Sequence, residues 1–99
     1  MTNPLEIVHT PEDSLFAIHI GDDMAYQEYI QTKTDLVITH TEVPTALEGK
    51  GIGSLLAKNA LTYAEENGLK MMPLCPFMAS YVRKHYHTYK HLLAPGFNV

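Results

Sequence analysis

The stretch EVPTALEGKGIGSLLAKNAL, from Glu42 to Leu61, joins a strand-like run to a helix-like run through three closely spaced glycines. Gly49, Gly51 and Gly53 occupy every second position at the expected start of a helix. Glycine is the poorest ordinary helix former, so this arrangement lowers helix stability. Two explanations are open: the glycines expose backbone N–H groups to an anion at a helix N-terminus, or they form a tight turn that needs positive φ angles.

The residues after this stretch predict a helix, a strand and a second helix. Apolar residues recur at helical spacing from Ile52, and Asn67-Gly68 is a typical C-terminal stop. A short apolar strand is expected from Lys70 to Leu74, and the next helix should begin at Pro76 and run through PFMASYVRKHY. The tail HLLAPGFNV is expected to add a last helical turn. Four residues of the second helix are expected to share one face: Phe77, Met78, Tyr81 and Val82.

The residues before the glycines read as four strands in an antiparallel meander. The expected strands are Leu5–Thr10, Leu15–Ile20, Met24–Thr32 and Asp35–Val43. The strand–helix–strand unit around the glycines implies that the strands at Leu36 and Met71 lie parallel, joined by a right-handed crossover. The predicted fold class is therefore α+β, with a mostly antiparallel sheet, a parallel central strand pair and two to three helices.

Composition indicates one small domain over residues 1–99, because 99 residues at 45% hydrophobic content can bury a single modest core. A lone cysteine and the lack of a basic and apolar leader at the N-terminus favour the cytoplasm. No apolar run approaches the roughly 20 residues that span a bilayer, so no membrane association is expected. The net charge of −4 argues against nucleic acid as a partner. The locally basic segment Arg83–His91 is either a patch for an anionic ligand or a solvated surface.

Two common phosphate-binding motifs do not fit the glycine stretch. A Walker A loop fails because Gly51 follows Lys50, and a dinucleotide fingerprint fails because Ser54 stands at its sixth position. The segment EGKGIGSLL instead resembles the pyrophosphate-binding signature Q/R-x-x-G-x-G/A of the Gcn5-related N-acetyltransferases. The wider combination HTEVP, GxGIG and PLC, between His40 and about His85, resembles the small single-domain branch of that family. Glu48 stands where the family usually has Gln or Arg, and a carboxylate there should weaken pyrophosphate binding unless it points away.

The resemblance implies that the protein binds acetyl-CoA or coenzyme A. In the family, the backbone at the end of the strand before the signature pairs with the pantetheine arm, and the signature amides hold the pyrophosphate. Lys50 is either a further charge-assisted contact or a solvated lysine. Carried over to this sequence, the cofactor-binding residues are Thr41, Glu42, Val43, Glu48, Gly49, Lys50, Gly51, Ile52, Gly53 and Ser54.

Cys75 and His40 are the candidate catalytic residues. By resemblance Cys75 lies near the thioester, where a thiolate favoured by the following helix N-terminus accepts the acetyl group; the alternative is a cysteine that only packs. His40 is either the general base that takes a proton from an amine or a structural histidine, and Glu42 is an alternative base. By strand alternation His40 is expected to share a face with Leu36, Ile38 and Glu42. Tyr81 is expected to belong to the core, although larger relatives use a tyrosine on this helix as an acid.

The function predicted from the resemblance is transfer of an acetyl group from acetyl-CoA to an amine, either directly or through an acetyl-cysteine. The alternative is a non-catalytic module that binds coenzyme A or acyl-CoA. No metal site is predicted, because His85 and His87 do not share a helix face and no HExxH motif is present. The acceptor amine and the oligomeric state stay open.

Overall fold

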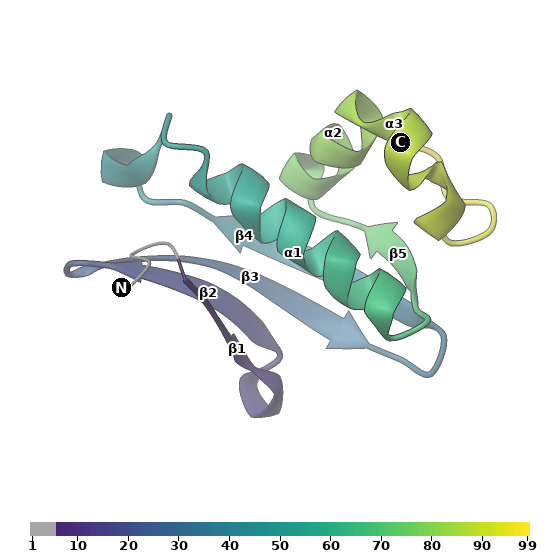
Figure 1. Cartoon of the computed structure of the whole chain (residues 1–99), viewed down its shortest axis with the longest axis horizontal. Coiled ribbons are helices and arrows are strands. Elements are labelled where there is room, and N and C mark those ends of the chain that lie inside the picture. Colours follow the sequence, from purple (N-terminus) through teal and green to yellow (C-terminus); the bar gives the residue numbers. More distant parts are fainter. Residues whose placement is uncertain (1–5) are drawn as a thin grey trace.

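Five strands form one sheet in the order in which they follow one another along the chain, β1-β2-β3-β4-β5. The computed structural model describes residues 6–99 (Figure 1). Strands β1 to β4 pair antiparallel, whereas β4 and β5 pair parallel with Leu36 opposite Met71. The predicted α+β class and its parallel pair are therefore confirmed. The strands are β1 (Ile7–Thr10), β2 (Leu15–Ile20), β3 (Asp23–Gln31), β4 (Asp35–Glu42) and β5 (Lys70–Pro73).

The helices follow the predicted order and differ mainly at the C-terminal end. The crossover helix begins at Ile52 and ends just before Asn67-Gly68, as predicted. The next helix ends at Lys84, because His85 leaves helical geometry with φ −117° and ψ 34°. A short helix and a 3-10 turn follow where a single last turn was expected. The helices are α1 (Ile52–Glu66), α2 (Pro76–Lys84) and α3 (Tyr86–Tyr89), with 3-10 turns η1 (Pro11–Asp13), η2 (Thr45–Leu47) and η3 (Lys90–Leu92).

Strand boundaries agree with the prediction to within two residues. Leu5, predicted to begin the first strand, lies outside the described residues. The tail after η3 adds a contact that the sequence did not reveal, since the amide of Ala94 donates to the carbonyl of Met71 at 3.0 Å on the free edge of β5. No helix within residues 6–99 is long and apolar enough to cross a bilayer.

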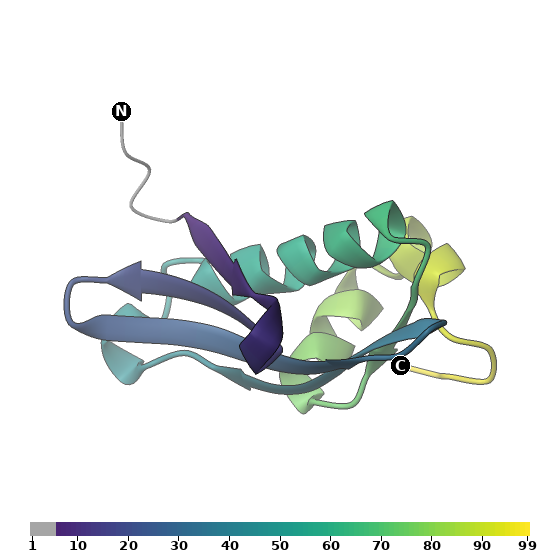
Figure 2. The same ribbon diagram turned by 90° about the horizontal axis from the view of Figure 1, so that it is seen from below.

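The core lies between the sheet and α1, which runs over one face of the strands (Figure 2). Phe16 and Ile18 of β2 and Ile38 of β4 face this helix and are buried, as are Leu56 and Leu61 on the helix. Burying a side chain of this size contributes about 1.5–3 kcal/mol. Since the same core cluster continues to α2, both helices are fixed relative to the end of β4.

The apolar face predicted for α2 is only partly correct. Met78 and Val82 are fully buried against the core, but Phe77 is 41% exposed and Tyr81 is half-buried. Consecutive helix positions differ by about 100°, so Phe77 and Tyr81 form a second stripe one turn apart, beside the stripe of Met78 and Val82. The Phe77 stripe turns toward the first turn of α1, where the candidate site lies.

Candidate functional site

A cleft of about 480 Å³ opens between the end of β4, the loop that follows it and the first turn of α1. Nine of the ten residues predicted to bind a cofactor line this cleft, and Lys50 is the exception. Leu47 and Phe77 also line it and were not predicted. The lining residues are Thr41, Glu42, Val43, Leu47, Glu48, Gly49, Gly51, Ile52, Gly53, Ser54 and Phe77.

The three glycines that open α1 serve two different geometric purposes. Gly49 and Gly51 have φ angles of +79° and +74°, in the left-handed region where other residues are strained. Gly53 is helical, but a Cβ atom added there would lie 2.6 Å from Cζ of Phe77. The first two glycines therefore allow the turn, whereas the third allows an aromatic ring to lie directly on the helix.

The N-terminus of α1 offers free backbone donors to the cleft. Gly51 occupies the N-cap position, and it has no side chain with which to cap the helix. The first N–H groups of an α-helix have no partner within the helix, and they carry the positive end of its dipole. The carboxylate-bearing Glu48 lines the same cleft, so the donors and one negative side chain share this space.

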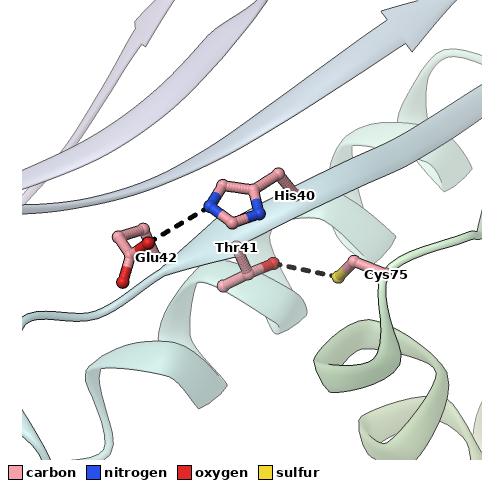
Figure 3. A network of polar contacts seen from close by, with 4 residues as sticks. All are labelled: His40, Thr41, Glu42 and Cys75. Carbon is pink, nitrogen blue, oxygen red and sulfur yellow. Dashed lines mark hydrogen bonds and ion pairs between the residues drawn. The ribbon is translucent and has the colours of Figure 1, made fainter.

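Cys75 lies beside Thr41, whose side chain points toward the cysteine sulfur (Figure 3). Its Sγ is 3.3 Å from Oγ1 of Thr41 and accepts the amide proton of Met78, which makes Cys75 the N-cap of α2. Nε2 of the fully buried Gln27 donates to the same Thr41 hydroxyl at 3.1 Å. Because that oxygen already accepts from Gln27, its own proton is free to point at the sulfur. Thr41 therefore links the cleft to a buried polar chain of three side chains.

His40 lies on the other face of the sheet, which corrects the prediction that it shares a face with Leu36 and Ile38. Glu28 pairs with His40 while the next residue of β3 pairs with Ile38, so Thr39 is an extra residue in β4. This bulge reverses the alternation of side chains beyond it. Glu42 does share the face of His40, as predicted, and its Oε1 is 3.2 Å from Nε2 of the imidazole (Figure 3).

Tyr81 packs against the core cluster, as expected, but keeps part of its surface exposed. Its ring centroid is 4.5 Å from that of His85 and 6.2 Å from that of Tyr89. Burial, together with the neighbouring Tyr89, raises the pKa of Tyr81 above its usual value of 10.0. The phenol is therefore neutral at physiological pH and available as a hydrogen-bond donor.

The histidines of the C-terminal segment do not gather. His91 contacts Oε2 of Glu65 at 3.0 Å, which ties η3 to α1. Over residues 6–99, no three His, Cys, Asp or Glu side chains come together as metal ligands do.

The sequence pattern of the GCN5-related N-acetyl-transferases matches residues 15–92, which include every strand from β2 onward, both longer helices and the cleft. The chain belongs to this family. The resemblance seen in the glycine signature is thereby confirmed.

The chain is also similar to individual curated proteins and to a solved structure. The chain is 32% identical to Protein NATD1 of Gallus gallus over 84 residues, covering 82% of this chain and 76% of the relative. It is 40% identical to Protein NATD1 of Xenopus tropicalis over 57 residues, covering 58% of this chain but only about half (51%) of the relative. The solution structure of a GCN5-like protein from Staphylococcus aureus superposes with a TM-score of 0.67 at 29% identity, covering 94% of this chain and 91% of that one.

Proposed function

We propose that the protein binds acetyl-CoA in the cleft at the start of α1 and transfers the acetyl group to an amine. The observation that carries this proposal is the uncapped N-terminus of α1, which opens into a cleft of about 480 Å³ through two left-handed glycines. Free amides at a helix N-terminus are a general anion site. Membership of the acetyltransferase family supports the pyrophosphate of coenzyme A as this anion.

The residues at the glycine end fit this substrate, with one opposing charge. Backbone donors from Gly49 to Ser54 suit the pyrophosphate, and Gly49 and Gly51 bring no side chain to obstruct it. Glu48 carries a negative charge into the same cleft and works against binding. Lys50 is exposed and does not line the cleft, so it offers at most long-range attraction. Affinity then depends mainly on the amides rather than on side-chain charge.

Two routes for the acetyl group follow from the other end of the cleft. In direct transfer the amine nitrogen attacks the acetyl carbonyl, His40 or a water takes the amine proton, and coenzyme A leaves as a thiol. In the covalent route the Cys75 thiolate forms a new C–S bond to the acetyl carbon while the bond to the coenzyme A sulfur breaks. Coenzyme A takes the proton that Cys75 lost, and the amine then displaces the cysteine.

The structure favours direct transfer, because Cys75 is only 5% exposed and does not line the cleft. Thr41 lines the cleft, and its Oγ1 is 3.3 Å from the sulfur. The covalent route therefore requires a rearrangement that brings the buried sulfur into the cleft. Direct transfer requires no such movement.

Intact mass spectrometry of the protein mixed with acetyl-CoA tests the proposal. We expect a non-covalent complex under native conditions, no added mass after denaturation, and free coenzyme A released when a primary amine is added. An acetyl mass that survives denaturation and disappears in Cys75→Ala would establish the covalent route instead. A native complex without turnover for any amine would identify a binding module. Absence of any complex at millimolar acetyl-CoA would refute the assignment of the cleft.

A further inference from the structure

A second, smaller hollow of about 100 Å³ adjoins the candidate site. It lies between the first turn of α1 and the second half of α2, and it shares Ser54 and Phe77 with the larger cleft. Its remaining lining residues are Ser80, Tyr81, Lys84 and His85. A space of this volume holds only a few water molecules, so it suits one small group rather than a whole nucleotide.

The lining of this hollow is rich in donors and contains no carboxylate. Lys84 forms no ion pair within the described chain. The hydroxyls of Ser54 and Ser80 are absent from the side-chain hydrogen bonds among the described residues. Residues 76–99 contain three of the seven basic residues of the protein and none of its eleven acidic ones. The larger cleft differs, since Glu48 lines it.

These features match the requirements of a phosphate monoester. Such a group is a dianion near neutral pH with three acceptor oxygens, and it binds to an ammonium group together with hydroxyl donors. Tyr81 adds a neutral phenol, and Lys84 brings the charge that the backbone amides of α1 cannot supply alone. Because Ser54 belongs to both spaces, a ligand seated on the α1 amides reaches the hollow without crossing the protein.

We propose that the hollow formed by Ser54, Ser80 and Lys84 binds the 3′-phosphate of coenzyme A and so distinguishes coenzyme A from its 3′-dephospho form. The inference rests on the proposed function, because it assumes that the pyrophosphate of the same molecule occupies the α1 amides. Under this proposal Lys84, in the basic segment Arg83–His91, has an anion-binding role.

Calorimetric binding of coenzyme A and of 3′-dephospho-coenzyme A to three proteins tests the inference. The proteins are the wild type, Lys84→Gln, and Lys90→Gln as a matched control. Lys90 is exposed and lies in the same basic segment, but it does not line either space. The control therefore removes one positive charge without touching the hollow.

We expect the wild type to bind coenzyme A about tenfold more tightly than the dephospho form, as one charge-assisted contact allows. Lys84→Gln should reduce this ratio to within about twofold while leaving the affinity for the dephospho form unchanged, and Lys90→Gln should keep the wild-type ratio. An equal ratio in the wild type and in Lys84→Gln would overturn the inference while leaving the proposed function intact. Failure of the wild type to bind either nucleotide would overturn both.

Discussion

Gly53→Ala would place a methyl group 2.6 Å from Cζ of Phe77, where ordinary van der Waals contact begins at 3.4 Å. The ring must therefore retreat by about 0.8 Å, which is the difference between these two distances. Overpacking of this kind costs about 1–3 kcal/mol. Because Phe77 is 41% exposed and can swing into solvent, we expect a cost near the lower limit, about 1 kcal/mol. Alanine in place of glycine within a helix returns about 0.5–1 kcal/mol, so the net change in unfolding free energy should be close to zero.

The same substitution should behave differently when the ring is absent. In Phe77→Ala, no aromatic atoms oppose the new methyl group, so Gly53→Ala should stabilise the protein by about 0.5–1 kcal/mol. The coupling between the two positions is then about 1 kcal/mol, measurable from urea unfolding of the four proteins of a double-mutant cycle. Gly51→Ala is the control, since nothing lies within 4 Å of its Cβ and only its φ of +74° matters. It should cost about 1–2 kcal/mol in both backgrounds. Equal effects of Gly53→Ala in both backgrounds would show that the ring does not rest on this glycine.

Three further substitutions test other features of the structure. Burial lowers the pKa of His9 below 6.5, so this histidine binds a proton more readily in the unfolded chain than in the folded one. The melting temperature should therefore fall as the pH drops below about 6.5, and His9→Gln should flatten this pH dependence; an unchanged slope in the variant would contradict the prediction. Thr41→Val removes the acceptor of the buried Gln27 amide and should cost about 1–3 kcal/mol in urea unfolding, whereas a cost below about 0.5 kcal/mol would speak against the polar chain. Glu48→Gln should raise the affinity for coenzyme A, measured by calorimetry, about two- to fivefold at low salt, and this increase should be smaller at high salt. Equal affinities at low salt would show that the carboxylate points away from the phosphates.

Local patterns were enough to predict the strand order and the crossover, because alternation before Pro44 and helical spacing after Ile52 are strong signals. Placement of side chains by alternation failed at His40, since nothing in DLVITHTEV marks Thr39 as an extra residue in β4. The bulge depends on how β3 and β4 pair, which is a property of two strands rather than one.

Phe77 was missed for a similar reason. Its place one position before Met78 suggested a core residue, and only the approach of α2 to α1 shows that its ring covers Gly53. The absence of a side chain at Gly53 was the available signal, but positive φ or phosphate binding explained that glycine equally well. Only the tertiary structure shows that a glycine is needed here because an aromatic ring from another helix packs against it.

The bulge at Thr39 also bears on the choice between the two chemical routes. Beyond it, β4 presents Thr41 toward the helices and Cys75, while His40 and Glu42 face the opposite side of the sheet. A base on that side cannot take the proton of Cys75, so these two candidates do not form a nucleophile–base pair of the kind that activates a cysteine. Under the proposed function the two sides have separate tasks, with the acyl donor on the helix side and the amine approaching from the side of His40. Direct transfer needs both sides at once, whereas acylation of Cys75 needs only the helix side. Loss of the His40 imidazole should therefore slow the overall acetyl transfer without changing the rate at which any acetyl-cysteine forms. A His40 variant that slowed both rates equally would mean that the imidazole acts on the Cys75 sulfur after all.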